Sequence, residues 1–263
     1  MSYPSPDALE AAGLEIAVDG AVLTVTLNRP DVRNAQTPAM WRGLAAIGAA
    51  VEPDVRVVVL RGWGASFSAG LDRAMLSPGG IEGEASFPQM ATAPEADFDA
   101  TVASYQEGFT WLRNPQFVSI AVVQGHAVGA GFQLALACDL RVLADDAQLC
   151  MKEPALGLVP DLTGTKPLVD AVGYARALEI CATARWVPAE EAYALGLGQA
   201  LIAHDQLDVH VAGLVAALTA APHGAVSGTK ALLQSAGDLD LAEQAAAERV
   251  AQRARFVDLL GAP

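Results

Sequence analysis

The segment from Ser119 to Thr165 limits the possible folds of this chain more than any other part of the sequence. Its apolar run Ile120–Val123 is typical of a buried strand. The small residues Gly129-Ala130-Gly131 follow a turn and lead directly into the apolar run 132–138, which predicts a helix. The first amides of such a helix have no partner within it, so they can donate hydrogen bonds to a ligand that approaches the glycine-rich backbone.

The same segment supplies one carboxylate in mostly apolar surroundings. A further strand is predicted over residues 140–143, and Glu153 follows it in the sequence Lys152-Glu153-Pro154. The sequence therefore predicts free amide donors and a lone carboxylate, both held on a glycine-rich frame.

Four blocks in this order resemble the enoyl-CoA hydratase/isomerase, or crotonase, superfamily. The first is the segment just described. The other three are Asn28-Arg29-Pro30 with Asn34-Ala35, Phe67-Ser68-Ala69-Gly70-Leu71-Asp72, and Ala189-Glu190-Glu191-Ala192 with Leu195-Gly196-Leu197. Each block is weak alone, but the four are collinear over most of the chain. The closing segment 256–263 departs from the family, because it looks shorter than the helix with which many members cover the acyl-CoA.

The resemblance implies an α/β fold of the crotonase type, a spiral of ββα units with a helical C-terminal trimerisation region. The pattern agrees, because strands alternate with helices in the first two thirds and helices alone fill the last third. We expect an acyl-CoA-binding core over residues 1–200 and a helical region over 201–263. The family further implies a homotrimer or hexamer.

Local signals predict individual elements. Residues 14–27 read as a hairpin around Asp19-Gly20, Thr37-Pro38 begins a helix, and residues 56–61 form a buried strand. Residues 77–98 hold several glycines, prolines and acidic residues, which predicts a long loop, either a lid or a surface insertion. Further helices are expected over 99–112, 164–183, 188–195, 205–220, 225–236 and 240–258.

Composition excludes several classes of function. The chain of 263 residues is 52% hydrophobic and 17% charged, which supports a sizeable core. The net charge of −14 argues against a nucleic-acid partner. The three cysteines suit neither a disulfide framework nor a metal site. We see no signal peptide and no apolar run of membrane-spanning length, so we expect a cytoplasmic protein without a membrane partner.

Coenzyme A is a polyanion, so an acidic CoA enzyme must place its few cations locally. By the resemblance, the CoA-binding positions are Arg29, Arg33, Ala35, Ala69, Gly70 and Asp72. Coenzyme A belongs to the substrate, and no separate cofactor or metal is expected. The resemblance also places an oxyanion hole at the backbone amides of Leu71 and Ala130, where two donors would stabilise a thioester enolate. The alternative is that both glycine-rich turns are merely tight connections.

Family hydratases use two glutamates to activate one water, and here the two positions are Gln133 and Glu153. Glutamine can hold a water but cannot take its proton. Asp161 follows Glu153 by eight positions, the spacing of a Glu and an Asp in family dienoyl-CoA isomerases. Asp161 is therefore either a further catalytic acid or the N-cap of the next helix. His126 is read as structural.

These residues favour an enzyme in which Glu153 moves a proton next to a thioester, isomerising 3-enoyl-CoA to 2-enoyl-CoA. One base suffices for that reaction. A 2-enoyl-CoA hydratase weakened by Gln133 is the close alternative. A catalytically degenerate acyl-CoA-binding protein is a third, although a pure binder has no need of a buried carboxylate.

Overall fold

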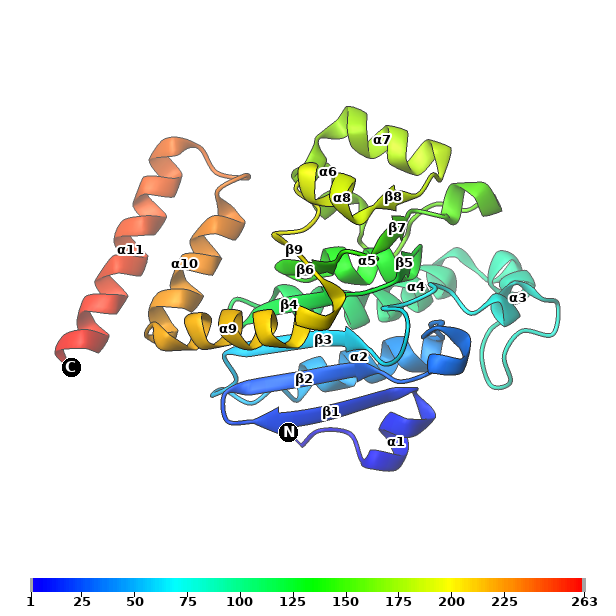
Figure 1. Ribbon diagram of the computed structural model, residues 1–263, viewed down its shortest axis with the longest axis horizontal. Coiled ribbons are helices and arrows are strands. Elements are labelled where there is room, and N and C mark those ends of the chain that lie inside the picture. Colours follow the sequence, from blue (N-terminus) through cyan, green and yellow to red (C-terminus); the bar gives the residue numbers. More distant parts are fainter. Residues whose placement is uncertain (1, 262–263) are drawn as a thin grey trace.

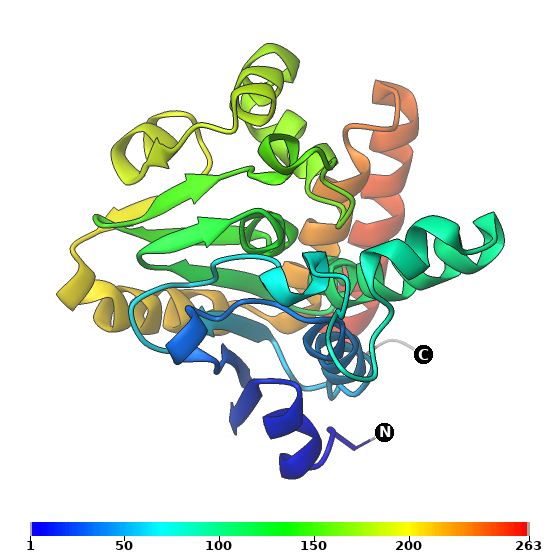
Figure 2. The same cartoon turned by 90° about the vertical axis from the view of Figure 1, so that its right-hand side faces the viewer.

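A six-stranded sheet forms the frame of the molecule, and the computed structural model describes residues 2–261 (Figure 1). The strand order is β1-β2-β3-β4-β6-β9. Figure 2 shows these strands stacked upward from the blue N-terminal hairpin to the green strands above it. The strands are β1 (Leu14–Asp19), β2 (Val22–Leu27), β3 (Val57–Gly62), β4 (Val118–Val123), β6 (Leu140–Ala144) and β9 (Ala200–Ile202).

The predicted hairpin is confirmed, since β1 pairs with β2 antiparallel from Leu14↔Leu27 to Asp19↔Val22. Gly20 adopts a positive φ of 55° in the turn, as the Asp-Gly signal requires. The remaining pairs, from β2·β3 to β6·β9, are parallel. Parallel neighbours need crossover connections, and these carry the helices and the functional loops.

A smaller sheet of three strands lies beside the first, in the order β5-β7-β8. It consists of β5 (His126–Val128), β7 (Gln148–Cys150) and β8 (Val187–Pro188). The sequence did not predict these strands, because two or three residues are too few to show an alternating pattern. They matter for function, since β5 ends directly before Gly129.

Helices follow the strands and cover the sheets. The α-helices are α1 (Pro6–Ala11), α2 (Pro38–Ala49), α3 (Phe87–Thr92), α4 (Glu95–Thr110), α5 (Ala130–Ala137), α6 (Thr165–Val172), α7 (Tyr174–Thr183), α8 (Ala189–Ala194), α9 (Leu207–Ala220), α10 (His223–Ser235) and α11 (Leu241–Leu260). Thr37 caps α2 as predicted: its side chain accepts a hydrogen bond from Met40 N, and Pro38 is the first helical residue.

Two predicted boundaries are wrong. Residues 77–98 are not one loop, because they contain α3 and the first turn of α4. A capping box between Ser86 and Gln89 starts α3 within a stretch that shows no helical period. The helix predicted over 164–183 is two helices, because Gly173 adopts φ 74° and breaks the run between α6 and α7.

The two faces of the larger sheet pack against different layers. Val58 and Leu60 point into the main core, whereas Val57 and Val59 belong to a second cluster with Leu207 on α9. This alternation follows from the two-residue period of a strand. Both faces of the central strands are therefore buried, as expected for parallel strands.

The last two helices pack on each other, and α10 is bonded to the segments that lead into β4 and β6. In Figure 1, α10 and α11 form an antiparallel pair at the left, and α11 buries none of its 20 residues. The division at residue 200 stays a prediction; β9 spans that point, and α9 lies on the larger sheet.

Among the described residues, no single helix is long and apolar enough to cross a membrane. Residues 204–220 and 223–235 meet that criterion only together, with a bend of 101° between them.

Candidate active site

A cavity of about 300 Å³ lies where the two glycine-rich turns meet. Its polar wall contains Glu153 and Asp161, together with the backbone of residues 69–71 and 128–130. The other walls are largely apolar and come from distant parts of the chain. They include Trp41, Met75, Phe87, Met90, Tyr105, Leu158 and Leu162. The structure therefore brings both predicted turns and both predicted acids to one cavity.

The first turn leaves one amide free. Gln36 N donates to Gly70 O over 2.7 Å, and Asp72 N donates to Gln36 O over 2.8 Å. This bridge alternates along the backbone, so the amide of Leu71 points away from Gln36. Within residues 2–261, no acceptor bonds to Leu71 N, and Leu71 lines the cavity.

The second turn leaves another amide free. Gly129 closes β5 by donating to Cys150 O over 2.8 Å, and its φ of 51° turns the chain into α5. The helix begins at Ala130, two residues earlier than predicted. A first helical residue has no acceptor within its helix, and no other described residue accepts a bond from Ala130 N. Both Gly129 and Ala130 line the cavity.

The two turns are in direct contact because Gly70 has no side chain. A Cβ on Gly70 would lie 2.2 Å from Val128 O and 3.5 Å from Ala130 N. Gly70 also has φ 82°, which L side chains rarely adopt. Glycine at this position thus lets the Leu71 and Ala130 amides face a shared space.

Glu153 is held by Gln133 rather than by the backbone alone. Gln133 Nε2 donates to Glu153 Oε1 over 2.7 Å. Gln133 Oε1 accepts hydrogen bonds from Leu162 N at 2.9 Å and Gly164 N at 3.2 Å. These two donors fix the orientation of the amide, since only its oxygen can accept them. Gln133 is fully buried and does not line the cavity.

The carboxyl group of Glu153 has one oxygen left for chemistry. Oε2 has no hydrogen-bond partner within residues 2–261. Burial raises the pKa of Glu153 above its ordinary value, while the bond from Gln133 opposes that rise and the charge of Asp161 adds to it. Gly129 allows the close approach, because a Cβ there would lie 3.0 Å from Oε1. The cavity is therefore lined by a buried carboxyl group with one unbonded oxygen and by the two turns with free amides.

Asp161 faces the cavity, and its proposed role as a helix cap is wrong. Helix α6 begins at Thr165, with Gly164 at the N-cap and no side-chain cap bond. The backbone carbonyl of Asp161 accepts a bond from Gln106 Nε2 at 2.7 Å, which ties this loop to α4. Desolvation by the surrounding walls raises the pKa of Asp161, although its side chain still reaches solvent.

This geometry agrees with a match to known proteins. A model described as Enoyl-CoA hydratase/isomerase matches residues 17–258. The chain belongs to this family. A crystal structure of a candidate enoyl-CoA hydratase from Thermobifida fusca YX, in complex with acetoacetyl-CoA, is 53% identical with a TM-score of 0.94. That alignment covers 98% of this chain and all of that one. The crotonase-type fold predicted from the sequence is therefore confirmed.

Other relatives carry two different activities in their names. Probable enoyl-CoA hydratase EchA17 of Mycobacterium tuberculosis H37Rv is 32% identical, and the alignment covers 93% of this chain and 87% of that protein. The peroxisomal Delta(3,5)-Delta(2,4)-dienoyl-CoA isomerase of Arabidopsis thaliana is 31% identical, with coverage of 82% and 78%. These two relatives, one named a hydratase and one named an isomerase, are thus similar to this chain at nearly the same identity.

The predicted CoA-binding positions fall into three groups. Ala69 and Gly70 line the cavity. Arg29 links the next two, since its Nη1 donates to Ala35 O at 2.6 Å and pairs with Asp72 Oδ2 at 3.0 Å. Arg33 is exposed beside them and donates no bond to a described residue from its side chain. Their role in binding CoA stays a prediction.

Two cations of the cavity wall were missed as site residues, namely Arg73 and Lys152. Arg73 directly follows Asp72 and Lys152 directly precedes Glu153, so adjacency to a predicted site residue was the available signal for both cations. His126, read as structural, has its Nδ1 3.1 Å from Ser66 Oγ and stacks edge-on against Trp186. Within residues 2–261, no group of three His, Cys, Asp or Glu side chains could hold a metal ion.

Proposed function

We propose that the protein acts on an acyl-CoA thioester and shifts a double bond from 3-enoyl-CoA to 2-enoyl-CoA. The observation that carries this proposal is the pairing of neutral Gln133 with Glu153 over 2.7 Å. This hydrogen bond leaves the other carboxylate oxygen of Glu153 unbonded, in the cavity that the two turns with free backbone amides also line. It also puts the side-chain amide of Gln133 where a hydratase of this family has its second acid. One base is what an isomerisation requires.

The reaction needs a proton to leave carbon 2 of the substrate and another to arrive at carbon 4. Glu153 takes the first proton, and the electron pair of that bond moves into the thioester to give a dienolate. The amides of Leu71 and Ala130 donate to its oxygen, and one such donor is worth about 3 kcal/mol in related chemistry. Glu153 then returns the proton to carbon 4, and the double bond lies between carbons 2 and 3.

Hydration of 2-enoyl-CoA is the second candidate, favoured by the relatives that are named hydratases. A water molecule cannot sit between Gln133 Nε2 and Glu153 Oε1, because those atoms are already in hydrogen-bond contact. A hydratase would then need Asp161, which lines the same cavity, as its second acid. A protein that only binds acyl-CoA is a third candidate, and the costly burial of Glu153 argues against it.

Coenzyme A is the part of the substrate for which the support is strongest. The Thermobifida fusca relative was solved with CoA and with acetoacetyl-CoA. In this chain, Arg73 and Lys152 lie on the cavity wall, and Arg29 and Arg33 lie in the adjoining motif. We expect calorimetry to show acyl-CoA binding far more tightly than the free fatty acid. Equal affinities would contradict recognition of the CoA part.

We also propose a homotrimer or a hexamer. Helix α11 buries none of its residues, and Val250, Phe256 and Leu260 on it are exposed. Such a helix is stable when a second copy covers it. Light scattering should give a mass of about three or six times 27.1 kDa.

A turnover screen tests the main proposal. Purified protein is given 2-enoyl-CoA and 3-enoyl-CoA of graded acyl length, and both products are quantified. We expect faster isomerisation than hydration. Hydration at an ordinary enzymatic rate with no double-bond shift would establish the hydratase instead, and no turnover of either class would leave only the binder.

A further inference from the structure

The segment 77–94 covers one end of the cavity but has few bonds to the rest of the protein. Phe87 and Met90 of α3 line the cavity, and Ile81 packs with them against the main core. The hydrogen bonds of this segment are otherwise local. They form turns, the capping box of α3 and the links to Ala74 and residues 97–98 at its two ends.

One ion pair is the exception. Arg42 on α2 holds Glu84 with two bonds, Nη1 to Oε2 at 3.0 Å and Nη2 to Oε1 at 2.5 Å. The Glu84 side chain is only 10% exposed, whereas that of Arg42 is 50% exposed. Within residues 2–261, no other hydrogen bond or ion pair joins residues 78–93 to a residue outside the segment and its ends.

The Arg42–Glu84 pair has a geometry in which an ion pair contributes to stability. Most exposed pairs contribute little, but a two-pronged arginine–carboxylate pair with a largely buried acid is a favourable case. A short segment with few apolar contacts opens locally at low cost, so one such pair can decide how often it opens. Arg42 directly follows Trp41, which lines the same cavity.

We propose that residues 77–94 form a lid over the acyl end of the cavity, and that the Arg42–Glu84 pair keeps this lid closed and thereby limits the length of the acyl group. The inference rests on the proposed function only for the identity of the ligand. Phe87 and Met90 are the lid residues that a bound acyl chain would meet. Arg42 and Glu84 are positioning residues, since neither lines the cavity.

Hydrogen exchange without substrate tests the latch independently of activity. In Arg42→Ala, amides of residues 78–93 should exchange about five to ten times faster than in the wild type. Amides of the larger sheet should be unchanged. Lys166→Ala is the matched control, because it breaks an exposed ion pair with Asp170 on α6, away from the lid. Equal exchange in Arg42→Ala and wild type would overturn the latch.

Two further arms exclude a simple packing defect. Glu84→Gln keeps the size of the buried side chain, so it should reproduce the faster exchange, and the double variant should exchange no faster than either single one. High salt should speed exchange of the lid in the wild type and leave Arg42→Ala unaffected. Additive effects, or no response to salt in the wild type, would contradict the ion pair as the cause.

The acyl-length part is tested by kinetics. In Arg42→Ala, kcat/KM for long acyl chains relative to short ones should rise several-fold through KM, with kcat unchanged, because Glu153 is not touched. An unchanged ratio would overturn the limit on acyl length. If the wild type turns over no enoyl-CoA, the proposed function fails, and the exchange experiment still decides whether the latch exists.

Discussion

Gln133 and Glu153 are joined by one hydrogen bond, in which Gln133 Nε2 donates to Glu153 Oε1 over 2.7 Å. The bond connects α5, which also carries the Ala130 amide, to the 3₁₀ turn Glu153–Leu156. Because Gln133 Oε1 is occupied by two backbone amides, the side chain cannot flip to present its oxygen. Gln133 thus sets which oxygen of Glu153 is free, and it does so from behind the cavity wall.

Glu153→Gln tests the base. The substitution keeps the shape of the side chain and removes its capacity to take a proton, so turnover should fall by at least ~10²-fold. CoA binding, measured by calorimetry, should stay nearly intact. Glu10→Gln, at an exposed position on α1, serves as the control. Unchanged turnover would move the chemistry to Asp161.

The pH dependence of catalysis should reflect the raised pKa of Glu153. The reaction requires the ionised form, so kcat/KM should fall as the pH drops through that pKa. The acid limb should lie above 4.5, the ordinary pKa of a glutamate. A limb at or below 4.5 would mean that Glu153 is not the titrating group, and Glu153→Gln should lack the limb altogether.

The same shift makes a prediction for stability. A group whose pKa is higher in the folded than in the unfolded protein stabilises the fold at a pH below its unfolded-state pKa. This stabilisation is lost as the pH rises through the folded-state pKa. At neutral pH the wild type therefore carries a buried charge that Glu153→Gln lacks. The variant should melt at a higher temperature at pH 7 and at nearly the same temperature at pH 4. Thermal scans at both pH values check this difference.

Gln133→Glu separates the two candidate reactions. The new carboxylate would still accept from Leu162 N and Gly164 N, but its other oxygen would face Glu153 Oε1. Like charges at this distance raise the pKa of one acid, so the pair would share a proton. Hydration of 2-enoyl-CoA should stay low, because position 133 lies outside the cavity, and a rise of about tenfold or more would show instead that a second acid at 133 was the missing part. Isomerisation should stay flat or slow down, and steady-state rates for both reactions decide between them.

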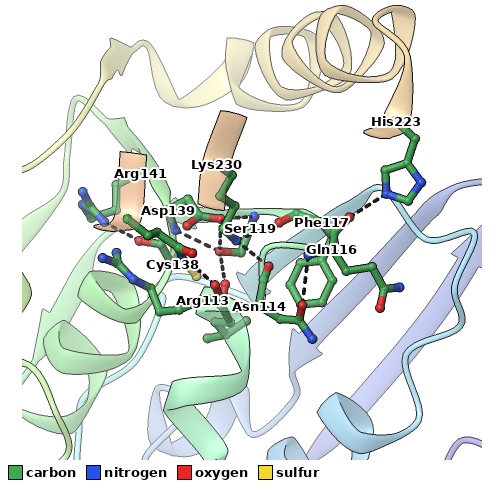
Figure 3. A network of polar contacts seen from close by, with 12 residues as sticks. Arg113, Asn114, Gln116, Phe117, Ser119, Cys138, Asp139, Arg141, His223 and Lys230 are labelled. Atoms are coloured by element: carbon green, nitrogen blue, oxygen red, sulfur yellow. Dashed lines mark hydrogen bonds and ion pairs between the residues drawn. The ribbon is translucent and has the colours of Figure 1, made fainter. Parts of the chain in front are cut away.

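Lys230→Met tests how α10 is attached to the sheet. Lys230 Nζ donates to Asn114 O, Phe117 O and Asp139 Oδ2, each at 2.7 Å, as Figure 3 shows. Asp139 is also bound by Ser119 N and Oγ, so the carboxylate keeps partners when the lysine is removed. We expect a loss of about 2 kcal/mol in the free energy of unfolding. Lys166→Met is the exposed control, and an equal effect of both would contradict this attachment.

The sequence predicted the elements that have a long period or a specific turn residue. The hairpin around Asp19-Gly20 and the capped start of α2 were read correctly for that reason. The small sheet and α3 were missed, because strands of two or three residues and a six-residue helix are fixed by tertiary contacts rather than by local preference. The family resemblance supplied the topology, which local patterns cannot specify.

The site was predicted unevenly for a similar reason. Motif spacing correctly brought Leu71, Ala130, Glu153 and Asp161 to one cavity. It could not show that Gln133 lies behind Glu153, because the two amides that orient it come from residues 162 and 164, in a loop without a motif. Nor could it show the Arg42–Glu84 pair, whose members are separated by 42 positions.

The contact between Gly70 and Val128 has a consequence for mutational scanning. The proposed donors at Leu71 and Ala130 are main-chain groups, which every residue except proline retains. Replacing Leu71 with alanine removes part of a cavity wall and keeps the amide, while Ala130 is already alanine. A side-chain scan would therefore pass over both positions and report instead Gly70, where any Cβ would press on Val128 O and push the two turns apart. Substitutions would therefore reveal the two backbone amides only indirectly, through loss of function at Gly70.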